Sequence, residues 1–155
     1  AGTTGAAGNG MPCAGTCTIK LQGTLMNAST PDSDKFLGHW VYQAGSTAMV
    51  SCSDSSAQTN NLAGDYVDFT TSGGGLVGSY YCDWNLTVGP AGNATVIKPN
   101  QSCSQTLDDP KLGMTMYTWH GTSFTFTTLD GKAGTLASTI DVNYVDDPTV
   151  TGCTP

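Results

Sequence analysis

Apolar and polar residues alternate with a period of two along most of the chain from Cys17 onward. In residues 76–88 one face carries mostly apolar side chains and the other mostly polar ones, and residues 136–144 repeat the pattern. Phe124 and Phe126 alternate with threonines in the same way. A period of two is that of a β-strand, whose successive side chains point to opposite faces of a sheet.

The alternation and the glycine-rich or polar breaks between runs predict strands at 17–27, 39–52, 64–71, 75–89, 94–98, 113–119, 122–129, 134–145 and 149–153. Asp130-Gly131 predicts a hairpin with a type I′ turn, because these residues readily adopt positive φ. Many short strands predict an all-β fold, an antiparallel up-and-down barrel or a β-sandwich of about 8 strands. The loop at 28–37 is interpreted as a boundary between an N-terminal unit and the main barrel.

Residues 1–16 are predicted to be a Gly/Ala/Thr-rich N-terminal arm, and residues 17–155 a single β-domain. Residues 1–12 (AGTTGAAGNGMP) offer few large side chains with which to form a core. Such a segment is disordered when nothing holds it. An ordered arm must therefore be held by Cys13 and Cys17, by the body of the domain, or by a neighbouring subunit.

The composition supports the all-β prediction and limits the kinds of partner that the protein can bind. The chain has no Glu and no Arg, whereas it has 12 Asp, 5 Lys and 24 Thr. Threonine favours strands, and the two missing residues favour helices. A net charge of −7 with no basic patch predicts no nucleic-acid partner. No apolar run approaches the ~20 residues of a transmembrane helix, so no membrane span is expected.

The six cysteines predict disulfides, and with them an oxidising compartment: a secreted or cell-surface protein. A start such as Ala-Gly-Thr-Thr is also what remains after a signal peptide has been removed. No CxxC pair occurs, and neither His39 nor His120 stands at zinc-ligand spacing from a cysteine, so no metal site is expected.

Spacing leaves the disulfide pairing open. A turn at Gly15 favours a local clip between Cys13 and Cys17. The other four cysteines would then pair among themselves: Cys52, Cys82, Cys103 and Cys153. The alternative is a bridge from Cys13 or Cys17 to Cys153, which would tie the two ends of the chain together.

Four pairs of nearby aspartates are candidates for calcium binding or for turn formation: Asp32/Asp34, Asp65/Asp68, Asp108/Asp109 and Asp146/Asp147. Calcium needs six to eight oxygen ligands, and no known calcium-loop pattern is present. Aspartates before proline, as in Asp109-Pro110 and Asp147-Pro148, are typical of turns.

Catalytic chemistry has little support in the sequence. No Gly-x-Ser-x-Gly nucleophile elbow occurs, and both histidines stand in strand-like runs or next to turns. No pattern places two carboxylates at the separation that glycoside hydrolysis requires. We therefore expect a protein that is not an enzyme and needs no cofactor.

Trp40, Trp84 and Trp119 each lie in a strand-like run with tyrosines nearby. Large aromatic side chains either fill the core of a small β-domain or line a pocket for an apolar or sugar ligand. Both interpretations are kept.

The stretch Gly38-His39-Trp40-Val41-Tyr42-Gln43-Ala44-Gly45-Ser46-Thr47 resembles the first strand and turn of avidin-like barrels, and its Gly-x-Trp resembles the opening motif of lipocalins. Ser46 matches a ligand-contacting serine of the avidin pattern, whereas Tyr42 stands where that pattern has an asparagine. Lipocalins also pack an arginine over the motif tryptophan, and this chain has none. The resemblance implies a barrel topology with a ligand in its mouth, and it does not extend to biotin binding.

Two classes of function follow from the sequence. The first is a structural or adhesive subunit of an extracellular assembly, a fibre or a surface layer, that self-associates through its N-terminal arm. The second is a small-ligand carrier of the calycin type, whose ligand-binding residues would be Trp40, Tyr42, Ser46, Trp84 and Trp119.

Overall fold

The computed structural model describes residues 12–30, 33–53, 56–110 and 113–155, and in these ranges the protein is all-β. These described ranges contain eleven antiparallel strands, more than the eight or so expected, followed by one short helix. The arm predicted at residues 1–16 falls mostly on residues 1–11, which lie outside the described residues. The strands are β1 (Ala14–Asn27), β2 (Gly38–Tyr42), β3 (Thr47–Cys52), β4 (Gln58–Asn61), β5 (Tyr66–Ser72), β6 (Gly75–Tyr80), β7 (Cys82–Val88), β8 (Ala94–Ile97), β9 (Ser102–Asp109), β10 (Gly113–Thr128) and β11 (Ala133–Val145), and the helix is α1 (Pro148–Thr151).

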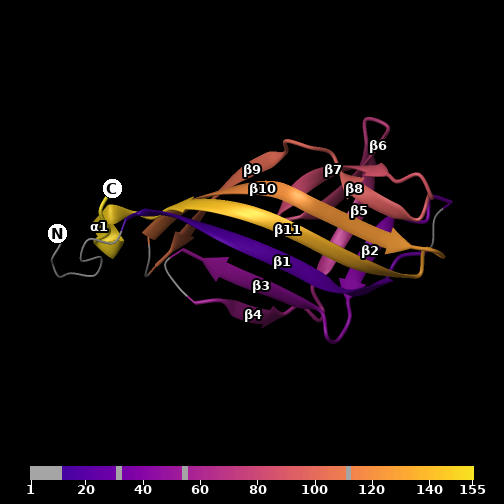
Figure 1. Ribbon diagram of the computed structural model, residues 1–155, viewed down its shortest axis with the longest axis horizontal. Helices are drawn as coiled ribbons and strands as arrows, with labels where there is room; N and C mark the ends of the chain where they lie inside the picture. The colour runs from indigo at the N-terminus through magenta and orange to yellow at the C-terminus, as the bar shows by residue number, and fades with distance from the viewer. Residues whose placement is uncertain (1–11, 31–32, 54–55, 111–112) are drawn as a thin grey trace.

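Three long strands run side by side through the whole molecule (Figure 1). β11 lies in the middle and pairs with β1 on one edge and with β10 on the other. Ala14 faces Val145 at one end of the β1–β11 ladder, and Met26 faces Ala133 at the other. These strands form a spine from which both halves of the fold are built.

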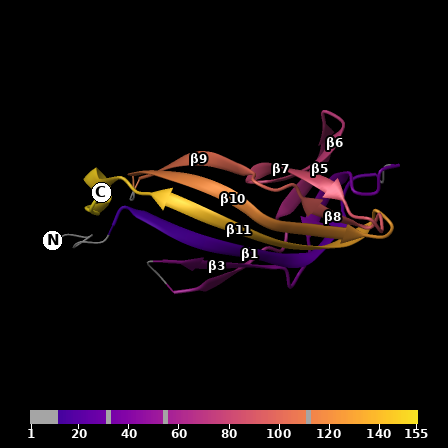
Figure 2. The same cartoon turned by 45° about the horizontal axis from the view of Figure 1, so that its top comes forward.

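One half of the molecule is a closed ring and the other is an open sheet (Figure 2). The ring runs β1-β2-β5-β6-β7-β8-β10-β11 and closes through the β11–β1 pairing. In the open half, the spine is flanked by β3 and β4 beyond β1 and by β9 beyond β10. The up-and-down ring thus accounts for eight strands, and the open half adds three.

Each outer strand of the spine changes its partner part-way along its free edge. In β1, residues 17–22 pair with β3 and residues 25–27 pair with β2. In β10, residues 113–120 pair with β9 and residues 125–127 pair with β8. The register of β10 against β11 shifts between Gly121 and Ser123, which is a β-bulge.

A glycine stands at each change of partner because a side chain there would collide with a neighbour. A Cβ on Gly23 would lie 2.3 Å from the Ser46 hydroxyl, and one on Gly121 would lie 2.5 Å from Ile97 and 3.0 Å from the Trp84 ring. Bulges and glycines let a strand bend away from one partner and toward the next.

Aromatic side chains fill the ring. Trp40 meets Phe126 edge to face, with ring centroids 4.7 Å apart, and Phe69 stacks on Phe126 at 4.5 Å. Trp40 and Phe126 are fully buried, and the Trp40 indole N–H donates to the Phe36 carbonyl at 2.9 Å. Each such side chain buries enough apolar surface to contribute roughly 2–3 kcal/mol. The loop at 33–37 connects β1 to β2 of the same sheet, so the predicted boundary at 28–37 is wrong.

Three disulfides cross-link the fold: Cys13–Cys153, Cys17–Cys52 and Cys82–Cys103. The predicted clip between Cys13 and Cys17 is wrong, because the chain between them enters the extended strand β1 instead of turning at Gly15. The alternative bridge between the two ends of the chain is confirmed by Cys13–Cys153. Two backbone hydrogen bonds hold the chain together at the same end of the molecule. The Cys13 amide donates to the Thr154 carbonyl, and the Cys13 carbonyl accepts from the Asp146 amide, both at 2.9 Å.

Turn chemistry explains where the predicted strands break. The segment 39–52 forms two strands, because Gly45 adopts φ 91° between them. The segment 75–89 breaks at Tyr81, with φ 63°. The predicted strand at 149–153 is instead the helical turn α1, in which the Asp147 carboxylate accepts from the Thr149 amide. The hairpin at Asp130-Gly131 is confirmed, but Asp130 does not have the positive φ of a type I′ turn.

The sequence pattern also missed or divided some strands. β4 and β9 were not predicted because both consist mainly of polar residues with little alternation, and β4 is also only 4 residues long. Segments 113–119 and 122–129 form the single strand β10, because the bulge at Gly121 shifts the register without ending the pairing with β11.

The disulfide that joins the two ends of the chain, Cys13–Cys153, should contribute more stability than the Cys82–Cys103 disulfide. Cys13–Cys153 closes a loop of 140 residues and Cys82–Cys103 one of 21 residues. In the chain-entropy account these are worth about 5 and about 3.5 kcal/mol. We expect Cys13→Ser with Cys153→Ser to lower the free energy of unfolding more than Cys82→Ser with Cys103→Ser does, measured by urea denaturation. A larger loss of stability in the Cys82/Cys103 variant would contradict an entropic origin of the disulfide stabilisation.

Candidate functional site

The five residues predicted to bind a ligand belong to the buried interior. Trp40 is 0% exposed, Tyr42, Ser46 and Trp84 are each 1% exposed, and Trp119 is 7% exposed. The structure brings four of them into one core cluster, where they pack against other side chains. None of the five lines any of the surface depressions described below.

Ser46 has a structural task at the place where β1 changes partner. Its hydroxyl accepts from the Thr24 amide and donates to the Thr24 carbonyl, both at 3.2 Å. Thr24 lies between the β1 residues that pair with β3 and those that pair with β2. Ser46 therefore supplies a partner for the Thr24 amide between the two paired stretches, while the Thr24 carbonyl also accepts from the Gln43 amide at 2.8 Å.

Two buried polar atoms have no hydrogen-bond partner among the described residues: the Tyr42 hydroxyl and the Trp119 indole nitrogen. Buried polar groups are nearly always paired, so each of these requires an explanation. Tyr42 lies edge to face with Tyr80 at 6.2 Å, and Trp119 stacks on Tyr81 at 4.7 Å with the rings 11° apart. Tyr42 thus contacts Tyr80, and Trp119 contacts the adjacent Tyr81.

A row of polar side chains crosses the outside of the ring next to these tyrosines. His39, Asp68, Ser79 and Asp83 face one another on the adjacent strands β2, β5, β6 and β7. The His39 Nδ1 atom lies 2.6 Å from an Asp68 oxygen, and the Ser79 hydroxyl donates to Asp83 at 2.5 Å. The period-two alternation in 76–88 predicts that Ser79 and Asp83 share its polar face, but the strand order that joins all four residues cannot be read from the sequence.

The row borders a depression of about 420 Å³. Its lining combines carboxylates, a hydroxyl and three tyrosines: Asp65, Tyr66, Asp68, Ser79, Tyr80, Tyr81 and Asp83. Tyr66 and Tyr81 are 49% and 56% exposed, whereas Tyr80 is buried and donates to Asp65 at 3.1 Å. We call this site the tyrosine–aspartate pocket.

Tyr81 holds a conformation that few bulky residues adopt. Its φ of 63° lies in the left-handed region, which costs roughly 1–3 kcal/mol for a residue other than glycine. The ring stacks on Trp119, the Tyr81 carbonyl accepts from the Gln105 side chain at 2.7 Å, and Cys82 beside it is cross-linked to Cys103. These contacts fix the ring at the edge of the pocket.

Neither histidine forms the nucleophile–base pair of a hydrolase within the described part of the chain. The Ser79 hydroxyl donates to Asp83, not to His39, and His39 binds Asp68 through Nδ1. The Nε2 atom of His120 lies 3.2 Å from the Asn143 amide nitrogen. A serine nucleophile needs a histidine within hydrogen-bond reach, so this geometry does not support acyl transfer.

The aspartates predicted as turn formers or calcium ligands bind nearby donors. Asp147 caps α1, and Asp34 accepts from the Phe36 amide at 3.0 Å. Backbone N–H donors hold the pKa of Asp130 below its usual value, and the hydroxyl and amide of Thr149 do the same for Asp147. In the described ranges, no three His, Cys or Asp side chains gather closely enough to hold a metal ion. Asp32 and the side chain of Asp109 lie outside the described residues.

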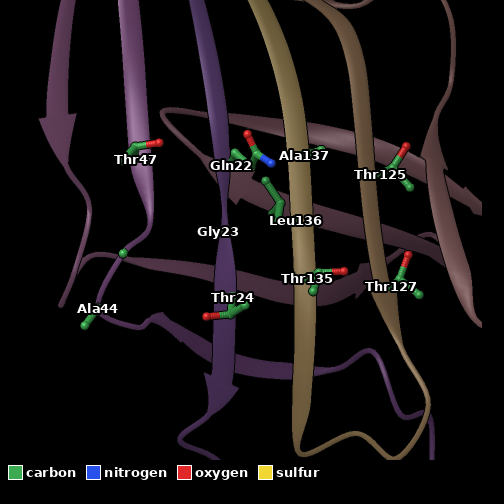
Figure 3. A pocket seen from close by; sticks show the side chains of 11 residues that line it. Gln22, Gly23, Thr24, Ala44, Thr47, Thr125, Thr127, Thr135, Leu136 and Ala137 are labelled. Carbon is green, nitrogen blue, oxygen red and sulfur yellow. The ribbon is translucent and has the colours of Figure 1, made fainter.

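A second depression, of about 620 Å³, lies on the outer face of the spine and is dominated by threonines (Figure 3). Thr24, Thr135 and Thr127 stand side by side on β1, β11 and β10. Gln22, Ala137 and Thr125 form the next row. No residue in its lining titrates, so this threonine face offers hydroxyl and methyl contacts without acid–base chemistry.

No protein family, curated protein or solved structure matches this chain.

The open half of the sheet ends in two edge strands. β4 pairs only with β3, and β9 pairs only with β10 among the described residues. An edge strand presents unpaired backbone N–H and C=O groups and is a template for another strand.

None of the described residues forms a helix with the length and apolar character that a membrane span requires.

Buried tyrosines should make the native protein sensitive to alkali. Burial, with the nearby Asp65 charge and Tyr81, raises the pKa of Tyr42 far above its ordinary value of 10.0, and the same causes raise the pKa of Tyr80. Above pH ~10 the unfolded chain releases protons that the native state retains, so stability falls as pH rises. Tyrosinate absorbance should show two of the six tyrosines ionising only as the protein unfolds. Normal titration of all six in the folded protein would contradict the assignment.

Tyr42→Phe should stabilise the protein. The hydroxyl is buried without a partner, and an unsatisfied buried polar group costs about 1–3 kcal/mol. We expect a rise in the free energy of unfolding of about 1 kcal/mol in urea denaturation, because the ring and its packing remain. Tyr80→Phe is the matched control, and it should destabilise because its hydroxyl donates to Asp65. Destabilisation by Tyr42→Phe would mean that the hydroxyl has a partner.

Proposed function

We propose that this protein is a secreted, non-enzymatic structural or adhesive subunit that assembles with copies of itself by adding a strand to an open sheet edge. The single observation that carries the proposal is the open half of the sheet. It leaves two edge strands, β4 and β9, paired on one side only. Three disulfides are compatible with an extracellular location.

β9 is the edge better suited to pairing with another chain. It has 8 residues, whereas β4 has 4, and short edge strands are a common protection against unwanted pairing. β9 contains no lysine and no proline, the residues that usually block an edge, and its Leu107 is 53% exposed. All four β4 side chains are exposed and polar.

The arm is the segment proposed to fill that edge on a neighbouring copy. Residues 1–11 carry no charged side chain, so they can approach an acidic surface without repulsion. Eleven extended residues span at most ~36–40 Å, longer than a strand of β9's length. Residues 1–11 join the described chain at Pro12, which forms a β-bridge with Thr154 beside the Cys13–Cys153 disulfide. Gly113, which lies near α1 at this end of the molecule, pairs with Asp109 at the end of β9.

The calycin-type carrier receives no specific support. Its proposed ligand residues Trp40, Tyr42, Trp84 and Trp119 pack into the core of the ring. The Ser46 hydroxyl forms hydrogen bonds with the Thr24 backbone amide and carbonyl. The surface edges therefore carry the proposal, and the ring interior does not.

Charged substitutions on the two edges test which one mediates assembly. Thr106 of β9 and Thr59 of β4 are both exposed threonines on edge strands, and Thr106→Lys and Thr59→Lys are therefore matched variants. We expect Thr106→Lys to reduce self-association strongly and Thr59→Lys to leave it unchanged, measured by light scattering on the eluting protein and by electron micrographs. The proposal fails if the wild-type chain is monomeric at all concentrations, or if both variants assemble normally.

A further inference from the structure

We infer that the tyrosine–aspartate pocket is a binding site for a small organic ammonium ion. The pocket places the exposed rings of Tyr66 and Tyr81 and the carboxylates of Asp65, Asp68 and Asp83 around one depression of about 420 Å³. The inference goes beyond assembly, because the pocket lies on the wall of the ring and not on an open edge of the sheet.

The charge of the lining selects for a cation. Three of its residues are aspartates, and none is a lysine. The chain has no arginine at all. The row itself contains one basic side chain, His39, which is bound to Asp68. The potential in the pocket is therefore negative, and an anionic ligand would be repelled.

The carboxylates retain acceptor capacity. Asp68 binds His39 through one oxygen, and Asp83 binds Ser79 through one oxygen. The second oxygen of each takes part in no hydrogen bond with the described residues, and Asp83 is exposed. These oxygens remain available to a ligand that enters from solvent.

The tyrosines select an organic cation over a metal ion. An ammonium group above an aromatic face is attracted by the ring's negative quadrupole, which is how aromatic cages bind quaternary amines. Tyr66 has its ring 4.5 Å from His39, and Tyr81 has one face on Trp119, so the outer part of each remains exposed. A metal ion would need a tighter group of ligands than any among the described residues.

Tyr42, whose buried hydroxyl has no partner among the described residues, adjoins two residues of the pocket lining: its amide donates to the Asp65 carbonyl at 2.7 Å, and its ring meets the Tyr80 ring edge to face at 6.2 Å. Trp119, whose indole nitrogen is the other unpaired buried atom, lies directly beneath the Tyr81 ring.

The test is calorimetric titration of the full chain with choline and with its uncharged carbon isostere, in which a tert-butyl group replaces the trimethylammonium. We expect saturable binding of choline and none of the isostere. Phosphocholine separates a free ammonium from a phosphate-bearing headgroup, and it should bind several-fold more weakly because its phosphate faces three carboxylates. No saturable choline binding, equal binding of the isostere, or equal binding of phosphocholine would overturn the inference.

Matched variants assign the binding to the pocket. Asp68→Asn with Asp83→Asn should weaken choline binding about five- to tenfold. Tyr66→Leu should weaken it about two- to fivefold through loss of the ring face, whereas Tyr66→Phe should retain it. Asp141→Asn, on the outer face of β11, is the control for loss of an exposed carboxylate elsewhere. Equal effects of Asp141→Asn and the pocket variants, at unchanged melting temperature, would refute the assignment.

The two proposals fail separately. Thr106→Lys changes the sheet edge and leaves the pocket residues intact, so it should bind choline as the wild type does. A chain that binds choline without assembling would remove the assembly proposal alone. A chain that assembles without binding choline would remove the ammonium site alone.

Discussion

The edges of β1 and β10 are each shared between two partners, and the rest of the structure depends on that division. A strand can bond to one neighbour at a time along each edge. β1 therefore turns from β3 to β2 near Gly23, and β10 turns from β9 to β8 near Gly121. On one side of these positions the sheet closes into a ring, and on the other it stays open. A larger residue at either glycine would meet Ser46 or Ile97 and Trp84, so the changeover requires the missing side chain.

Closure and opening give the two halves different physical roles. The ring buries its aromatic side chains and fills its own interior, which leaves its chemistry on the outside wall. There the strand order gathers His39, Asp68, Ser79 and Asp83 into one row beside the tyrosines. The open half has no such closure, so its unpaired edges are the natural place for contacts with another chain. Assembly and ligand binding are thus assigned to separate surfaces of one fold.

The absence of arginine and glutamate has consequences for both surfaces. No guanidinium neutralises the aspartates of the pocket, and the nearest basic group is a histidine. Their negative charge is therefore available to an external cation. On the edges, the scarcity of lysine leaves β9 without the lysine that commonly prevents strand pairing, and its only charged residues are Asp108 and Asp109 at one end. A composition that suits strands also leaves these two surfaces without positive charge.

The sequence alone determined the all-β class, most strand positions and the use of disulfides. Period-two alternation, β-branched residues and turn-forming aspartates act locally, and 76–88, Asp130-Gly131 and Asp147-Pro148 illustrate this. Which strands become neighbours was decided only in the tertiary structure, because register and closure depend on pairings distant in sequence. The same pairings join Cys17 to Cys52 and Cys82 to Cys103, bury the tryptophans that the sequence offers as ligand-binding candidates, and bring Asp68 next to His39. Side-chain direction can be read from the pattern, but the identity of the neighbour cannot.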